Sequence, residues 1–234
     1  MMRTAGGSKL APEIPTPATA MRRNRTAVAV VSVLAVVLGF VAAFAPSWLL
    51  MIDRPVSEWV RDLGFHRFFL GVTQIGAMGA AVLFGVVVSV LLWGCCRAFA
   101  YTVPIVIAGG FATDIAIKLL VARPRPPQPL IGTGLSSFPS GHVILTVIVL
   151  GLVPPVVLIV TESRRWFRIA IGAMAVGVPL VAVSRINLGA HWPSDVLASV
   201  FIGAALLLAA EYVAGSVWHH REAGGCALHP RTRR

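Results

Sequence analysis

Six apolar segments, each long enough to cross a lipid bilayer, divide this sequence and set the strongest limit on its fold. They are residues 26–45, 69–93, 104–121, 142–160, 167–183 and 195–217. A membrane-spanning helix needs about 20 apolar residues, and only helices and closed barrels satisfy the backbone polar groups inside a bilayer. Hydrophobic residues make up 57% of the chain and charged residues 12%, which excludes an ordinary soluble domain. We therefore expect an all-α, polytopic membrane protein built as a six-transmembrane helix bundle.

The segments before and after the apolar region are basic, and they divide the chain into three parts. Residues 1–25 contain a basic cluster and show no apolar periodicity, so we expect a disordered tail. Residues 26–217 form the membrane domain, and residues 218–234 form a second basic tail. The first apolar segment has no convincing cleavage site, so we expect an anchor that is not removed.

The distribution of Lys and Arg predicts the orientation of the bundle. The two tails and the even-numbered loops hold thirteen of the 20 basic residues, and basic residues favour the cytoplasmic side of a membrane. We expect both termini in the cytoplasm and the odd-numbered loops on the extracytoplasmic side of the plasma (inner) membrane. This distribution also explains the net charge of +11, and we expect no nucleic-acid partner.

The first outer loop contains a helical pattern of its own at residues 53–64. Apolar residues recur on one side, namely Val56, Trp59, Val60 and Leu63, while Ser57, Glu58, Arg61 and Asp62 lie on the other. Asp53 and Pro55 are typical of a helix start, and Gly64 of a helix end. We expect a short helix on the membrane surface. A packed loop helix with no role in binding is the alternative.

Three polar clusters interrupt the apolar pattern, at residues 118–126, 138–142 and 184–197. The first cluster ends the third apolar segment, the second begins the fourth, and the third joins the fifth to the sixth. Successive membrane helices alternate in direction, so all three clusters lie on the same side of the membrane. We expect them to form a single site.

The residue types in these clusters favour phosphate chemistry. The cations are Lys118, Arg125 and Arg185, and Ser140-Gly141 offers a hydroxyl and a backbone N–H at a helix start. Cations and helix-start N–H groups bind anions, and Arg matches phosphate with two parallel hydrogen bonds. His142, His191 and Asp195 supply a nucleophile, an acid and an orienting partner. The combination predicts phosphoryl transfer.

We expect no metal and no cofactor at this site. The three cations would repel a divalent ion beside His142, His191 and Asp195. The three cysteines, Cys95, Cys96 and Cys226, have no metal-ligand spacing, and we expect no structural disulfide.

Each candidate residue also has an alternative explanation. Lys118 and Arg123 could anchor a helix end by extending to the interface, and we interpret Arg123 in this way. His142 and His191 could be ordinary interfacial histidines. Asp195 could be an acid in the first turn of a helix, where it favours the helix dipole.

Asp114 lies one helical turn before Lys118 inside an apolar segment. We expect the two residues to form an ion pair that lowers the cost of burial. An orienting role for Asp114 toward Lys118 is the alternative.

Taken together, the clusters resemble the three-part signature of the type-2 phosphatidic acid phosphatase superfamily: Lys-x6-Arg-Pro, Pro-Ser-Gly-His and Ser-Arg-x5-His-x3-Asp. The matching positions are Lys118 with Arg125-Pro126, Pro139-Ser140-Gly141-His142, and Ser184-Arg185 with His191 and Asp195. The motifs cover a minority of the chain, but their order, spacing and position at the ends of spans are specific. The family spacing selects Arg125, which leaves Arg123 as a cation behind the phosphate-binding residues or at the rim of the site. Asn187 stands where many relatives carry an aromatic residue, which bears on substrate fit.

The resemblance implies an integral membrane lipid phosphatase that needs no metal. It implies that His191 attacks phosphorus to form a phosphohistidine, that Asp195 holds the other ring nitrogen, and that His142 protonates the leaving oxygen. It also implies a set of groups that hold the phosphate oxygens: Lys118, Arg125, Arg185, Ser140 and the Gly141 amide.

The expected partners are a lipid phosphate substrate and the bilayer. Polyprenyl diphosphate, a phosphorylated prenyl sugar, phosphatidylglycerol phosphate and phosphatidic acid all fit, and in a bacterium a role in the cell-wall lipid carrier would be natural. Two alternatives stay open, a phosphotransferase on the same scaffold and a non-catalytic lipid-phosphate transporter or binding protein. The sequence does not indicate an oligomeric state.

Overall fold

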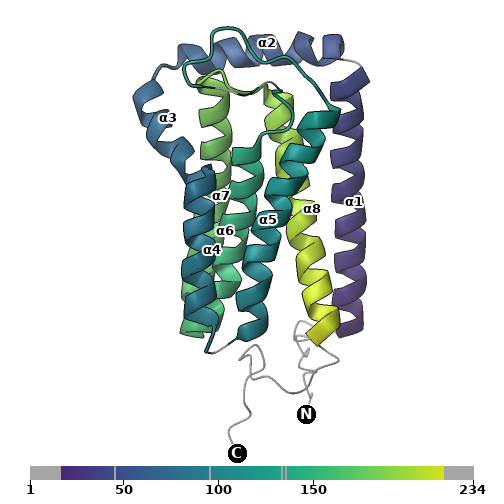
Figure 1. Ribbon diagram of the computed structural model, residues 1–234, viewed down its shortest axis with the longest axis vertical. Coiled ribbons are helices and arrows are strands. Elements are labelled where there is room, and N and C mark those ends of the chain that lie inside the picture. The colour runs from purple at the N-terminus through teal and green to yellow at the C-terminus, as the bar shows by residue number, and fades with distance from the viewer. Residues whose placement is uncertain (1–16, 45, 95, 133, 135, 219–234) are drawn as a thin grey trace, which may run out of the picture.

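The computed structural model describes residues 17–44, 46–94, 96–132, 134 and 136–218, and every regular element among them is a helix (Figure 1). The elements are α1 (Pro17–Phe44), α2 (Pro46–Asp62), α3 (His66–Val72), the 3-10 helix η1 (Thr73–Gly76), α4 (Met78–Leu92), α5 (Arg97–Leu120), α6 (Gly141–Thr161), α7 (Arg164–Asn187) and α8 (Pro193–Trp218). The all-α class predicted from the apolar segments is therefore confirmed.

Five helices are long and apolar enough to cross a membrane: α1, α5, α6, α7 and α8. A sixth span is formed if α3, η1 and α4 are taken together, although this segment bends by 43°. The long helices run alongside one another (Figure 1). Helix α6 forms the core, since 67% of its apolar window is buried, compared with 6% in α1. The expected bundle is present, with one span bent instead of continuous.

The start of α1 differs from the prediction. The helix begins at Pro17, so part of the expected disordered tail is helical. Residues 18–25 are rich in Ala, Met and Arg, which favour helices, and Pro17 occupies the first helical position, where proline is well tolerated. The remaining parts of the two predicted tails, residues 1–16 and 219–234, lie outside the described residues.

Cys96 lies in the connection between α4 and α5 and is disulfide-bonded. This finding corrects our expectation of no structural disulfide. The other two cysteines of the chain, Cys95 and Cys226, lie outside the described residues.

Helix α2 lies across one end of the bundle (Figure 1). It begins at Pro46 rather than near Asp53, and Pro55 lies inside the helix; the proline in the favourable first position is thus Pro46. Its buried residues are Asp53, Ser57 and Val60, while Trp48, Met51, Ile52 and Trp59 are exposed. The polar side chains Asp53 and Ser57 therefore face the protein. Ser57 and Val60, which we predicted on opposite sides of the helix, are both buried, and this corrects their predicted positions. The exposed apolar side suits a helix on a membrane surface.

Asn187, the last residue of α7, holds the junction between α2 and α3. Its Nδ2 donates to the carbonyl oxygens of Val60 (2.7 Å) and Gly64 (3.0 Å), and its Oδ1 lies 2.8 Å from Nδ1 of His66. The side chain is fully buried. Asn187 therefore ties two helices to the bundle, and its expected effect on substrate fit stays a prediction.

We predict that Asn187→Ala destabilises the protein by about 1–3 kcal/mol, because the buried carbonyl of Val60 and the part-buried carbonyl of Gly64 lose their donor. Thermal unfolding in detergent micelles, followed by tryptophan fluorescence, measures the effect. Gln74→Ala is the control, since the Gln74 amide is exposed. Equal melting temperatures for the two variants would contradict this role of Asn187.

Candidate active site

The three polar clusters meet at the end of the bundle that α2 covers (Figure 1). Lys118 lies in the last turn of α5, His142 in the first turn of α6, and Arg185 in the last turn of α7. His191 lies in the connection from α7 to α8. Lys118, Arg125 and Arg185 interact electrostatically with both His142 and His191. The structure thus brings together the residues that the sequence predicted to share a site.

The start of α6 provides the predicted hydroxyl and backbone N–H group. Ser140 precedes the helix and is fully buried, and its Oγ has no hydrogen-bond partner within the described residues. A Cβ atom on Gly141 would lie 2.6 Å from Oδ2 of Asp114, so any other residue would displace this carboxylate. The close approach brings the start of α6 against the turn of α5 that carries Asp114 and Lys118.

The three cations are held in ways that leave donors for an anion. Lys118 Nζ lies 2.7 Å from Oδ2 of Asp114, which confirms the expected ion pair. Arg125 donates to two backbone carbonyl groups, of Gly134 (2.7 Å) and Ala190 (2.6 Å). An ammonium has three N–H donors and a guanidinium has five. Lys118 and Arg125 therefore keep donors beyond those used in these contacts.

Arg185 is buried and depends on a partner that the sequence did not indicate. Its Nη1 donates to Oγ1 of Thr73 at 2.8 Å, and its Nε has no partner in the part of the chain that the structure describes. Thr73 begins η1, at the bend between α3 and α4. The bent part of the second span therefore brings a hydroxyl to this cation.

His191 is held by a backbone carbonyl group. Its Nδ1 lies 2.6 Å from the carbonyl oxygen of Ser137, and the side chain is buried. A carbonyl oxygen only accepts hydrogen bonds, so Nδ1 carries the proton and Nε2 keeps its lone pair. The ring is therefore in the tautomer that a nucleophile needs. A carbonyl in a loop has no sequence signature, which is why this contact was not predicted.

Asp195 has partners different from the expected one. Its Oδ2 accepts from the backbone N–H of Trp192 (2.9 Å), and its Oδ1 accepts from Nη1 of Arg123. No hydrogen bond joins Asp195 to His191 among the described residues, which corrects the predicted contact. Asp195 does lie in the first turn of α8, where a carboxylate also favours the helix dipole.

Arg123 is buried, at 3% exposed. It therefore does not extend to the interface, and it lies behind the site residues, as the family spacing implied. Its Nη2 lies 2.7 Å from Oδ2 of Asp53, and its Nη1 contacts both Asp195 and Oγ of Ser194. Asp53 lies far away in the sequence, on α2. Sequence spacing alone therefore gave no signal for this pair.

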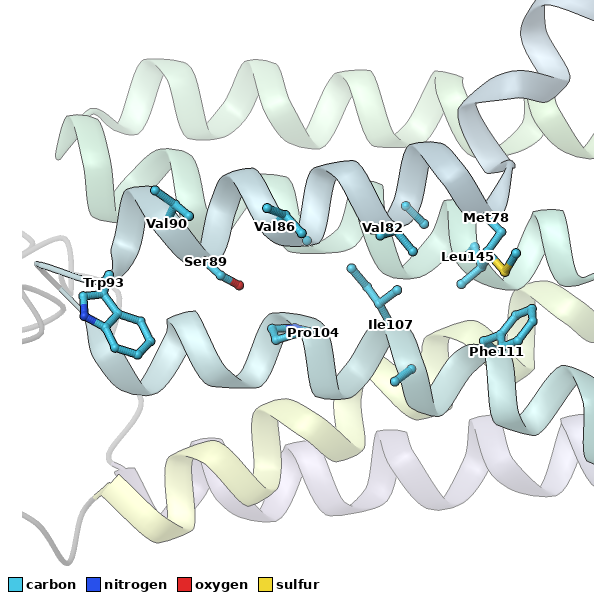
Figure 2. A pocket seen from close by; sticks show the side chains of 13 residues that line it. Met78, Val82, Val86, Ser89, Val90, Trp93, Pro104, Ile107, Phe111 and Leu145 are labelled. Atoms are coloured by element: carbon cyan, nitrogen blue, oxygen red, sulfur yellow. The ribbon is translucent and has the colours of Figure 1, made fainter.

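An apolar groove between α4 and α5 leads toward the site. Its volume is about 720 Å³, and Figure 2 shows Met78, Phe111 and Leu145 at one end and Trp93 at the other. Phe111 lies about one turn before Asp114 on α5, and Leu145 about one turn after His142 on α6. One end of the groove thus lies about one helical turn from Asp114 and from His142.

The fold and the site together define a class: a polytopic helical membrane protein with a cluster of cations and histidines at one end of the bundle. The chain belongs to the PAP2 superfamily, whose sequence model matches residues 81–216, more than half of the 234 residues. This match confirms the resemblance seen in the three motifs.

Two comparisons give more detail. Over 123 residues the chain is 35% identical to decaprenylphosphoryl-5-phosphoribose phosphatase of Mycobacterium tuberculosis, in strains CDC 1551 / Oshkosh and H37Rv, and the match covers 46% of this chain and 59% of the relative. The fold is similar to the crystal structure of a transmembrane PAP2 type phosphatidylglycerolphosphate phosphatase from Bacillus subtilis, with a TM-score of 0.72 and 18% identity over 86% of this chain and 98% of the other. At this identity the second comparison shows the fold alone.

We predict that His191 titrates below its ordinary value of 6.5. Burial lowers the pKa of His191 well below that value, Arg185 and Arg125 lower it further, and the hydrogen bond to Ser137 raises it in part. His191 is then neutral at neutral pH. NMR titration of ¹⁵N-labelled histidine in micelles measures the value, with His191→Gln to assign the signal. A midpoint at or above 6.5 would overturn this prediction.

Proposed function

We propose that this protein is an integral membrane lipid phosphatase that hydrolyses a phosphomonoester or diphosphate of a lipid through a phosphohistidine intermediate. The observation that carries the proposal is the contact of His191 Nδ1 with the Ser137 carbonyl oxygen. It leaves Nε2 of a buried, neutral imidazole as the nucleophile, beside the three cations Lys118, Arg125 and Arg185. Binding alone would not need this tautomer.

The reaction runs in two steps. Nε2 of His191 attacks phosphorus, the bond to the leaving oxygen breaks, and protonated His142 gives its proton to that oxygen. Water then attacks the phosphohistidine, His142 accepts the proton of the water, and the N–P bond to His191 breaks to release phosphate. The cations, the Ser140 hydroxyl and the Gly141 N–H stabilise the charge on the phosphate oxygens, which is the main contribution of a protein to phosphoryl transfer.

We propose that this chemistry needs no metal. The phosphate oxygens face three cationic side chains, which supply the positive charge that a divalent ion provides in other phosphoryl-transfer sites. Within the described residues, no group of three His, Cys, Asp or Glu side chains is placed to hold a metal ion.

The groove between α4 and α5 supports a lipid as the substrate. Its lining is almost entirely apolar, and Val82, Val86 and Val90 are exposed on the side of the bundle. A lipid tail in the groove would place the phosphate at the cations. The relative at 35% identity is named for a decaprenyl-linked phosphosugar, so we place a phosphorylated prenyl sugar first among the possible substrates.

The basic residues support an orientation with both termini in the cytoplasm and the site on the extracytoplasmic side of the plasma (inner) membrane. Helix α1 ends and α8 begins at the end of the bundle that carries the site (Figure 1). The start of α1 and the end of α8 lie at the opposite end. Seven of the 20 basic residues lie near the starts of α1, α5 and α7, at that opposite end: Arg22, Arg23, Arg25, Arg97, Arg164, Arg165 and Arg168.

We predict that the purified protein releases phosphate from one or more members of a panel of lipid phosphates, and that His191→Ala lowers this rate by about a thousandfold or more, because the nucleophile is lost. A phosphate-release assay measures both rates. Turnover that persists in excess chelator and is inhibited by vanadate supports the histidine route. Loss of turnover in excess chelator would contradict it.

The same assay separates the alternatives. Transfer of phosphate to an added acceptor alcohol in preference to water would indicate a phosphotransferase. Lipid-phosphate binding without turnover, unchanged in His191→Ala, would indicate a non-catalytic protein.

We also predict that Ala108→Trp, which narrows the groove, lowers kcat/KM for a long-chain lipid phosphate by about tenfold, or about 1.4 kcal/mol. The rate with a short, water-soluble phosphomonoester stays the same, because the cations and histidines are unchanged. Ile105→Trp is the control, since Ile105 is exposed on the same helix but does not line the groove. Equal losses for both substrates would argue against a tail in this groove.

A further inference from the structure

We infer that Asp53, on the surface helix α2, is a positioning residue for His191 and acts through a buried network with Arg123, Ser194 and Asp195. The inference rests on the proposed function, because it assigns Asp53 to the support of the proposed nucleophile. The family motifs do not include Asp53, and neither the groove nor the phosphate site contains it.

Asp53 contacts the start of α8 with both carboxylate oxygens. Its Oδ1 accepts from the backbone N–H of Ser194 (2.9 Å), and its Oδ2 accepts from Oγ of Ser194 (2.6 Å) and from Nη2 of Arg123 (2.7 Å). The side chain is 1% exposed. A carboxylate in this position is stabilised both by the guanidinium and by the free N–H groups at the helix start.

Arg123 links Asp53 to His191 through two chains of hydrogen bonds. On one side its Nη1 contacts Asp195, which accepts from the N–H of Trp192, the residue after His191. On the other side its backbone carbonyl accepts from the N–H of Ser137 at 2.9 Å. The carbonyl of Ser137 then holds Nδ1 of His191. A shift of Arg123 therefore changes the position of the imidazole through two routes.

Attachment of α2 to the bundle does not by itself explain Asp53. The C-terminal end of α2 is already held by Arg61, which donates to the carbonyls of Pro127 and Gln128 (both 3.0 Å), and by Asn187. An apolar residue at position 53 would join α2 to the bundle without a buried charge. Buried charges are costly unless fully paired, and their clearest use is to fix one arrangement of the groups around them.

The test compares Asp53→Asn with Asp62→Asn. The two substitutions are identical and lie on the same helix, but Asp62 is exposed. Steady-state kinetics with the best lipid phosphate gives kcat and KM. Hydrogen–deuterium exchange of residues 188–196 in micelles gives the mobility of the connection that carries His191, independently of activity.

We expect Asp53→Asn to lower kcat at least tenfold with KM within twofold of the wild type, and to speed exchange at the amides of Trp192 and Ser194. Asp62→Asn should match the wild type in all three measurements. If Asp53→Asn does not give folded protein, Ser194→Ala takes its place. This variant removes only the hydroxyl shared by Asp53 and Arg123, and we expect a fall in kcat of about threefold, with the same faster exchange at Trp192.

Three results would overturn the inference: kcat within twofold of the wild type, a rise in KM alone, or a loss of kcat without faster exchange at Trp192. Failure of the proposed function is a separate outcome. It appears as absence of phosphate release from the wild-type protein, and in that case the exchange measurement alone decides whether Asp53 controls the connection from α7 to α8.

Discussion

The Arg123 guanidinium holds together the end of the bundle on which the proposed chemistry depends. It lies between Asp53 of α2 and Asp195 of α8, and all three side chains are buried. Removing one partner of a buried ion pair costs about 3–5 kcal/mol, because the remaining charge is left unpaired. The surface helix, the segment after α5 and the start of α8 are therefore fixed relative to one another, and the connection that carries His191 lies between these fixed points.

Two arginines only two positions apart have different roles because their partners differ. Arg123 contacts two carboxylates, so its charge is neutralised inside the protein. Arg125 donates to the neutral carbonyl groups of Gly134 and Ala190, and Arg185 donates to the hydroxyl of Thr73. Neutral acceptors fix the guanidinium without cancelling its charge, so these two cations remain available to a phosphate group. Lys118 is an intermediate case, because it pairs with one carboxylate, that of Asp114, whereas Arg123 pairs with two.

Much of this arrangement is predictable from the sequence where local spacing decides the outcome. The apolar segments predicted the spans, alternation of direction placed the three clusters together, and the one-turn spacing predicted the pair of Asp114 and Lys118. The prediction for α2 was wrong at Ser57 and Val60, which are both buried against the bundle. Helical periodicity shows which residues share a face, but it does not show which face packs against the protein. The contacts of Asp53 with Arg123 and of His191 with Ser137 join distant segments, and they exist only after the helices have packed.

The proposed substrate would be recognised in two parts that share one helix. Helix α5 lines the groove with Phe111, and it presents Asp114 about one turn later and Lys118 about two turns later to the site. A lipid in this groove would therefore have its tail beside α4 and α5 in the apolar layer, with its phosphate at the level of the cations. The reacting histidines come from elsewhere, namely from α6 and from the connection between α7 and α8. Changes in α4 or in the first part of α5 can thus alter the preference for the tail without moving the nucleophile.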